Sequence, residues 1–319
     1  MDERQALCRA RASELGESQF GTATAGVDTW FALEHDGPWA AKAWEAAAVP
    51  AQVRAHVDGW ATATSGTRVQ LIRRDLVVRR EALLRRDATA NEHSQPIVGG
   101  ANVLLLASTR PGAVRVAQFR WAELDDLLAI DLLAATAALR EGRLPDGAEE
   151  PTSPIVLVCT NGKRDRCCAK WGTPVYESLA ADPRVQTWQT THLGGHRYAA
   201  TMVWLPAGIC HGRVEPDHVP TLVDAMLAER IGPLALLRGR TALSEAAQAA
   251  ECLWREEHGA QGLDDVVIEA ASEHDGHWHL TGRVCGRAVA IDVRRIVGEH
   301  VAPPSCGKPD EPTASWRRV

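Results

Sequence analysis

One stretch in the second half of the chain concentrates the side chains that bind soft metals. Cys159 ends a short apolar run, and Cys167 and Cys168 follow a basic loop. His192 and His196 then flank a Gly-Gly pair. Thiolates and imidazoles together suit zinc, iron–sulfur or copper rather than magnesium or calcium. We therefore expect a redox-metal site here, with the rest of the chain supporting it.

Composition narrows the class of protein. The 319 residues carry a net charge of −6, and basic residues occur in short clusters without a dominant basic tract, so nucleic acid is not expected as a partner. No run of eighteen apolar residues occurs and the first residues are charged, which argues against a membrane span and a secretory signal. We expect a cytoplasmic protein whose eight cysteines are reduced or metal-bound.

The domain organisation is predicted from one segment of linker composition, EGRLPDGAEEPTS at 141–153. It separates an N-terminal α/β domain (1–150) from the metal-bearing domain (151–235). Residues 236–319 predict a small α+β appendage with one helix, three strands and a Pro-rich tail that contains Cys306.

Residues 151–235 predict the order β-α-β-β-β-α, which is the thioredoxin-like pattern. The expected elements are strand Ile155–Val158, helix Pro174–Ala181, strands Val185–Thr190, Ala200–Leu205 and Ile209–Val214, and helix Val219–Ile231. The first half reads in nearly the same order, which is consistent with a degenerate thioredoxin-like repeat. Its expected elements include a hairpin at Ala101–Ala107 and Ala113–Phe119, a long helix at Trp121–Arg140 and an exposed loop at Arg79–Gln95.

Cys159 lies where a buried strand passes into a loop, the edge at which α/β folds build binding sites. A single cysteine there is more often a small buried apolar residue. Cys168 follows nine residues later, across the basic loop Lys163–Arg166, whose charges would lower thiol pKa values unless that loop is merely solvated. Because adjacent side chains diverge, only one of Cys167 and Cys168 is expected to join Cys159 on a metal.

The sequence His192-Leu193-Gly194-Gly195-His196 would place both rings on one face of a helix, but two glycines favour a loop that wraps closely around a bound group. Two cysteines and two histidines also suit a structural zinc site, although their spacing lacks the C-x(2–4)-C knuckle. A thioredoxin-like thiol oxidoreductase is a further alternative, although the C-x-x-C motif is missing.

The remaining candidates have simpler explanations. We expect core or incidental cysteines at Cys8, Cys252 and Cys285, a turn position for His211, and a solvated strand for His274, His277 and His279.

Four sequence blocks resemble the sucrase/ferredoxin-like family. They are VDTWFALEHDGPW, CTNGKRDRCCAKWGTPVY, HLGGHRYAA and LPAGICHGRV. The resemblance spans most of residues 20–230 and implies a thioredoxin-like [2Fe–2S] ferredoxin domain. It also implies the branch of the family in which two histidines replace the second cysteine pair.

The resemblance assigns the cluster ligands to Cys159, Cys168, His192 and His196, because the family's cysteine directly precedes a turn that here is Ala169–Gly172. Cys167 is the fallback. Relatives often carry histidine where this chain has Asn161, so a role for that position is not carried over.

The resemblance therefore implies an electron carrier rather than an enzyme. One iron would take the two thiolates and the other the two imidazoles. The histidines would couple electron uptake to proton uptake, and the basic loop would dock an acidic redox partner protein.

Overall fold

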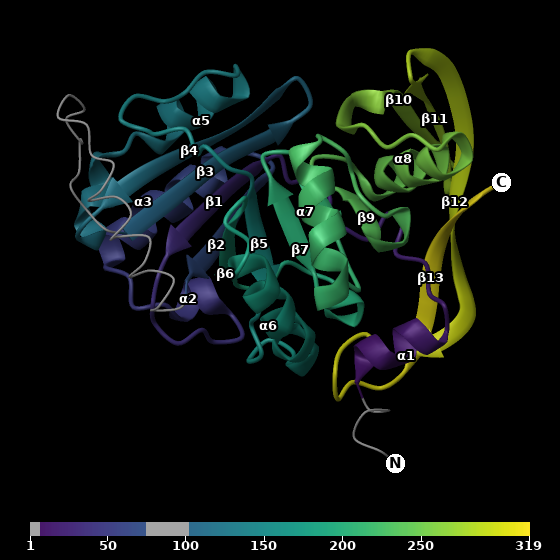
Figure 1. The fold of residues 1–319 in the computed structure, drawn as a ribbon, viewed down its shortest axis with the longest axis horizontal. Coiled ribbons are helices and arrows are strands. Elements are labelled where there is room, and N and C mark those ends of the chain that lie inside the picture. The colour runs from purple at the N-terminus through teal and green to yellow at the C-terminus, as the bar shows by residue number, and fades with distance from the viewer. Residues whose placement is uncertain (1–6, 75–101) are drawn as a thin grey trace.

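The chain forms one large mixed sheet with helices on both sides and a smaller sheet at its C-terminal end (Figure 1). The computed structural model describes residues 7–74 and 102–319. Its first half contains α1 (Cys8–Glu14), β1 (Thr29–Glu34), α2 (Ala43–Ala46), α3 (Ala51–Ala63), β2 (Thr67–Arg73), β3 (Asn102–Arg110), β4 (Ala113–Trp121), the 3₁₀ helix η1 (Leu124–Ala129) and α5 (Leu132–Arg140). The second half contains β5 (Ile155–Cys159), α6 (Arg166–Ala180), β6 (Gln186–Thr190), β7 (Met202–Leu205), β8 (Ile209–His211), α7 (Val219–Leu227) and β9 (Leu237–Arg240). The chain ends with α8 (Glu245–His258), β10 (Val266–His274), β11 (His277–Val284), β12 (Arg287–Ala302) and β13 (Glu311–Arg318).

The large sheet repeats one strand arrangement twice. Its order is β4-β3-β1-β2-β6-β5-β7-β8-β9. In each half the first two strands are parallel, and the next two continue antiparallel on the other side of the first strand. Both halves thus have the thioredoxin-like order, as the sequence predicts, and the α/β fold class is confirmed.

The two half-sheets meet at a short seam. Strands β2 and β6 pair only through Ile72 with Thr190 and Arg73 with Gln189. Beyond the seam the inner faces pack on each other in one apolar cluster that includes Trp30 and Trp188. The sheet therefore curls, because side chains from both halves bury the same apolar surface.

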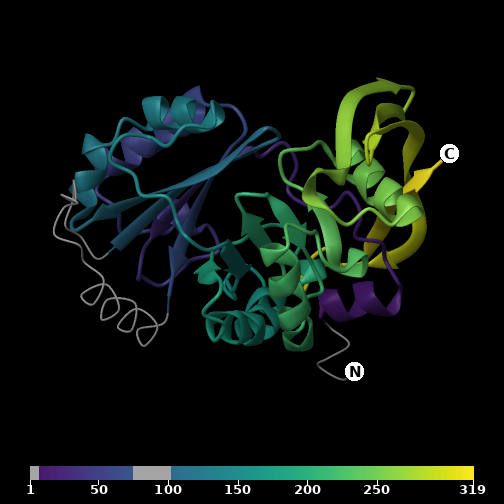
Figure 2. The ribbon, with the colours of Figure 1, turned by 45° about the horizontal axis from the view of Figure 1, so that its top comes forward.

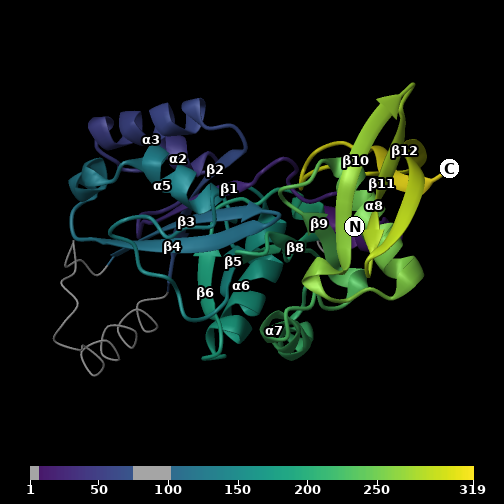
Figure 3. The same ribbon diagram turned by 90° about the horizontal axis from the view of Figure 1, so that it is seen from above.

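The outer faces are covered by the halves' own helices. Figure 3 shows α3 and α5 on one side of the large sheet, and α6 and α7 on the other. Strands β1 and β5 are buried along their whole length. Their apolar residues face the inner cluster and the outer helices alternately, which explains why both strands read as continuous apolar runs.

The C-terminal strands form an antiparallel sheet in the order β10-β11-β12-β13, against which α8 packs. Figures 1 and 2 show α1, near the other end of the chain, beside the yellow C-terminal strands. Strand β9, which follows residue 235, pairs with β8 in the large sheet. The division of the chain into three domains stays a prediction.

Three predicted elements differ from the structure. The long helix Trp121–Arg140 is divided into η1 and α5, because Ile130 is extended and Asp131 caps a new helix by accepting a hydrogen bond from Ala134 N. Helix α6 begins at Arg166 rather than at Pro174, which lies inside it. The Pro-rich tail forms a fourth strand, β13.

Two further expectations concern exposure. The loop predicted at Arg79–Gln95 lies outside the described residues. Within the described ranges, no helix has the length and apolar character needed to span a lipid bilayer.

His211 lies in β8 and not on a turn, and it provides a test of the core. Its ring is 1% exposed, its Nε2 lies 2.8 Å from the Ile231 carbonyl oxygen, and burial lowers its pKa to about 4. An unfolded histidine titrates near 6.5, so as pH falls from 6.5 to 4 only the unfolded chain gains this proton. We expect the free energy of unfolding to fall by about 3 kcal/mol across that range because of this group.

The substitution His211→Gln keeps an N–H donor and removes the titration. Urea unfolding of the variant should show a flatter dependence on pH between 6.5 and 4. The control is His274→Gln, at a ring 93% exposed, which should leave the wild-type curve unchanged. If the free energy of unfolding of His211→Gln falls between pH 6.5 and 4 as steeply as that of the wild type, His211 is not the group that causes the fall.

Candidate metal centre

Strand β5 presents Cys159 to the space between the two half-sheets. Ile155, Leu157 and Cys159 alternate along the strand and all belong to the inner apolar cluster. The thiol is 2% exposed and stands at the carboxyl end of the strand. Alternation along the strand therefore fixes both the position and the direction of this side chain.

Helix α6 starts beside this strand end and carries two cysteines. Asp165 caps the helix, since its carboxylate accepts a hydrogen bond of 2.8 Å from Cys167 N. Cys168 joins the inner cluster with Cys159, whereas Cys167 packs with Cys8 in a different cluster. The two adjacent thiols thus diverge, as expected from the sequence.

Close approach of α6 to β5 depends on Gly172. A Cβ atom at this position would lie 2.1 Å from the Cys159 carbonyl oxygen. The segment Ala169–Gly172 that we expected as a turn is therefore part of the helix, and its glycine lets the helix lie against the strand.

The loop after β6 brings in the two histidines. Gly194 and Gly195 both have positive φ, and a Cβ at Gly195 would collide with the Arg238 guanidinium. The Gly-Gly pair thus forms a loop, as predicted, and His196 starts only a short 3₁₀ helix.

The carbonyl groups of this loop are held from outside the expected metal-bearing domain. Arg68 Nη2 donates to the His192 oxygen at 2.6 Å, and Thr24 Oγ1 donates to the Leu193 oxygen at 2.6 Å. Arg238 Nη1 donates to the Gly194 oxygen at 3.1 Å. The loop conformation therefore depends on the N-terminal half and on β9.

Three of the four expected ligands lie together. His192 Nδ1 is 3.9 Å from Cys159 Sγ and 3.7 Å from Cys168 Sγ, and these three atoms all lie within 4.8 Å of one another. The hydrogen bond from the Cys168 thiol holds the pKa of Cys159 well below its usual value, although burial opposes this. The largest effects on this pKa thus come from Cys168, burial and His192 rather than from the basic loop.

His196 lies against this group without being part of its tight contact. Its ring stacks on that of His192, with centroids 5.1 Å apart. Its Nε2 is 2.8 Å from the Pro304 carbonyl oxygen, which can only accept, so Nε2 carries the proton. Burial lowers the pKa of the ring, which favours this neutral form.

The other ring nitrogen of His196 gives a direct test for a missing ligand. Nδ1 is buried and has no hydrogen-bond partner among the described residues. An unsatisfied buried acceptor costs about 1–3 kcal/mol, and a metal ion is one way to satisfy it. The residues present therefore fit a metal centre of two thiolates and two imidazoles.

Comparison with known protein families identifies the family of this chain. The model of the sucrase/ferredoxin-like family matches residues 20–239. The chain belongs to the sucrase/ferredoxin-like family. The match includes all four expected ligands and all but the last residue of β9, and it leaves Cys8 and Cys306 outside.

Two similar proteins extend the comparison of this sucrase/ferredoxin-like chain. It is 28% identical over 106 residues to the altered inheritance of mitochondria protein 32 of Meyerozyma guilliermondii, a match that covers 30% of this chain and 38% of that protein. A thioredoxin-like [2Fe–2S] ferredoxin from Aquifex aeolicus is 18% identical, with a TM-score of 0.23, over 27% of this chain and 91% of its own. A score this low carries no argument, and the thioredoxin-like order rests on the strand pairings.

Sequence reasoning missed several groups around this centre. The Asp165 cap could have been found as an acidic residue before a helical run, but we placed the helix start later. Nothing in the sequence pointed to the Pro304 carbonyl group. Asn161 is buried and donates to the Ala40 carbonyl oxygen at 3.0 Å, so it braces the loop after β5 against the first half.

The cysteines set aside as incidental divide into two kinds. Cys252 is buried in α8 and Cys285 is exposed, as core and surface positions would be. Cys8 differs, because its Sγ lies 3.4 Å from that of Cys167.

Gly172→Ala should damage the fold and the metal centre together. The new methyl group must push α6 away from β5, which we expect to cost about 1–3 kcal/mol of unfolding free energy and to lower metal retention. The matched control is Gly59→Ala in α3, where a Cβ meets nothing within 4 Å and helix propensity predicts a gain of up to about 1 kcal/mol. Urea unfolding and metal analysis measure both effects. Wild-type values for Gly172→Ala would contradict the close-approach argument.

Proposed function

We propose that this chain is an electron-transfer protein that holds one [2Fe–2S] cluster through Cys159, Cys168, His192 and His196. The observation that carries the proposal is the convergence of two thiols and an imidazole, with a second imidazole whose buried Nδ1 has no partner among the described residues. The family membership supports it. A cluster with imidazole ligands exchanges single electrons at a higher potential than one held by four thiolates.

The protein's own groups prepare the site for this role. Cys159 and Cys168 would hold one iron, and His192 and His196 the other. The Pro304 carbonyl group fixes the tautomer of His196, as second-shell partners of metal-bound histidines commonly do. The half-buried Arg68 and the buried Arg238, which hold the loop, also place positive charge near an anionic centre.

The surface beside the site suits an acidic protein partner. Lys163, Arg164 and Arg166 are exposed and lie between β5 and the first turn of α6. Opposite charges accelerate encounter, so electron transfer to such a partner would slow as ionic strength rises. The basic surface thus indicates the charge of the partner proteins that give or take the electron. The cytoplasmic location stays a prediction.

Adjacent cysteines provide a matched test of the ligand set. Cys168→Ser should lose most of its iron and sulfide, because its thiol faces Cys159 and His192. Cys167→Ser should keep both, since that thiol points toward Cys8. Iron and sulfide analysis of anaerobically purified protein measures the difference. Full cluster content in Cys168→Ser would exclude the assignment.

Proton coupling follows from the partial exposure of His192. Its Nδ1 faces the thiols, which leaves Nε2 to exchange a proton with solvent. Reduction adds negative charge at the site, which favours uptake of a proton by a histidine ligand, so electron and proton uptake are linked. We expect the reduction potential to fall by about 59 mV per pH unit across the range in which one proton is taken up with the electron.

Protein-film voltammetry from acid to alkaline pH tests this coupling. His192→Cys should lower the potential and flatten its slope, because a bound thiolate does not titrate in this way. If the reduction potential of the wild type stays constant across this pH range, no proton is taken up with the electron. Histidine would then affect the potential only through its charge.

A structural zinc site is the second candidate. The three atoms of Cys159, Cys168 and His192 are close enough for one ion, and zinc accepts this donor set. A colourless protein with zinc in place of iron and sulfide would favour it. A thiol oxidoreductase is less well supported, because both thiols are only 2% exposed and so are closed to a protein substrate.

A further inference from the structure

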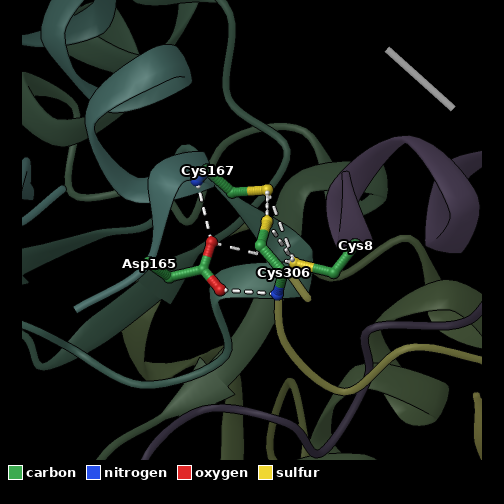
Figure 4. A group of neighbouring side chains, drawn as sticks. All are labelled: Cys8, Asp165, Cys167 and Cys306. Atoms are coloured by element: carbon green, nitrogen blue, oxygen red, sulfur yellow. Dashed lines mark hydrogen bonds between the residues drawn. The ribbon is translucent and has the colours of Figure 1, made fainter. Parts of the chain in front are cut away.

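A second group of metal-binding side chains lies on the other side of the α6 start (Figure 4). Cys8 comes from α1, Asp165 and Cys167 from the start of α6, and Cys306 from the loop between β12 and β13. One ligand atom from each lies within 4.8 Å of every other. Three distant segments of chain therefore meet at a single point.

The sulfur atoms are spaced as ligands of one ion. Cys8 and Cys167 Sγ are 3.4 Å apart, Cys167 and Cys306 Sγ 3.2 Å, and Cys8 and Cys306 Sγ 3.7 Å. Tetrahedral zinc with Zn–S bonds of about 2.3 Å places its sulfur ligands about 3.8 Å apart. Movements of a few tenths of an ångström would complete that geometry. A cluster of two or more irons would hold its cysteines farther apart.

Asp165 is fixed in place to supply a fourth ligand. Its Oδ2 accepts hydrogen bonds of 2.8 Å from both Ser305 Oγ and Cys306 N. Its Oδ1 accepts from Cys167 N at 2.8 Å and lies 4.0 Å from Cys8 Sγ. A carboxylate oxygen has room for a second interaction, so Oδ1 can also face an ion among the sulfurs.

We propose that Cys8, Cys167, Cys306 and Asp165 together bind one zinc ion. Three sulfurs select a soft or borderline metal, and the carboxylate favours zinc over monovalent copper. Zinc replaces the thiol protons, because the thiolate is the form that binds metal. The positive end of the α6 dipole, at Cys167, stabilises the added negative charge.

The zinc site would act as a clamp. It joins the beginning of α1 and the loop before β13 to the start of α6. The same loop places the Pro304 carbonyl group on His196, whose Nε2 is also 3.8 Å from Asp165 Oδ2. Zinc would thus hold in place the segment that orients His196. This site is independent of the identity of the metal held by Cys159, Cys168 and His192.

The alternatives are ordinary packing and a disulfide bond. Packing alone does not gather the buried cysteines in the described part of the chain, since Cys210 and Cys252 belong to neither group of metal-binding side chains. No disulfide joins the three cysteines in this structure, where their sulfurs lie 3.2–3.7 Å apart and an S–S bond is about 2.05 Å long. The experiment distinguishes both alternatives from a metal site.

Metal analysis of the untagged full-length protein, purified without oxygen, tests the proposal. We expect one zinc per chain at this site in the wild type, and a second if the centre at Cys159 also holds zinc. Cys8→Ser and Cys306→Ser should each retain at least tenfold less zinc than the wild type after dialysis against a chelator, and iron is measured in the same samples. Cys285→Ser, at an exposed position, should lose neither metal. Cys168→Ser should keep its zinc, which distinguishes this site from the one at Cys159.

Cys306 lies in a partly exposed loop, so its variant should fold even if Cys8→Ser does not, and circular dichroism checks this. Wild-type protein without zinc would overturn the proposal, as would folded Cys306→Ser that retains full zinc. An intact mass lower by two hydrogen atoms, with a disulfide mapped among these three cysteines, would overturn it in favour of oxidation.

Discussion

The packing of the two half-sheets against each other organises the whole structure. Only two residue pairs join β2 to β6, so the halves are held together mainly by the shared apolar cluster between them. Cys159 and Cys168 belong to that cluster. The candidate metal centre therefore lies between the half-sheets, away from water, where charge–charge interactions and hydrogen bonds are stronger than at the surface.

Buried and half-buried polar groups position the loop between the two half-sheets. The carbonyl oxygens of three successive residues, from His192 to Gly194, each accept a hydrogen bond from a side chain of another segment. Arg68 from β2 and Arg238 from β9 are two of these donors. Burying an arginine is costly unless it is paired and hydrogen-bonded, so the loop and the arginines stabilise each other. The first half thereby contributes to the geometry of a site whose expected ligands all lie in the second.

Asp165 links the two groups of metal-binding side chains. It caps α6 and accepts hydrogen bonds from Cys167, Ser305 and Cys306. Burial would raise the pKa of its carboxyl group, but the hydrogen bonds from Cys306, Ser305 and Cys167 outweigh this and lower it to about 2. The carboxylate is therefore charged at neutral pH and holds the C-terminal loop against the start of α6. The C-terminal loop thus contributes to the surroundings of His196.

The local features of this protein could be predicted from its sequence. Strand periodicity gave the order of β5 to β8, the adjacent positions of Cys167 and Cys168 implied that their thiols diverge, and the glycines before His196 predicted a loop. Motif resemblance singled out Cys159, Cys168, His192 and His196, of which the structure brings three into direct contact and stacks the fourth on His192. The tertiary structure alone decided the contacts between distant segments, including Arg68 on the loop, Pro304 on His196, and Cys8 and Cys306 beside Cys167. These contacts form because the large sheet curls and because the C-terminal segment comes back to the start of α6. No local sequence pattern encodes them, since they join residues more than one hundred positions apart.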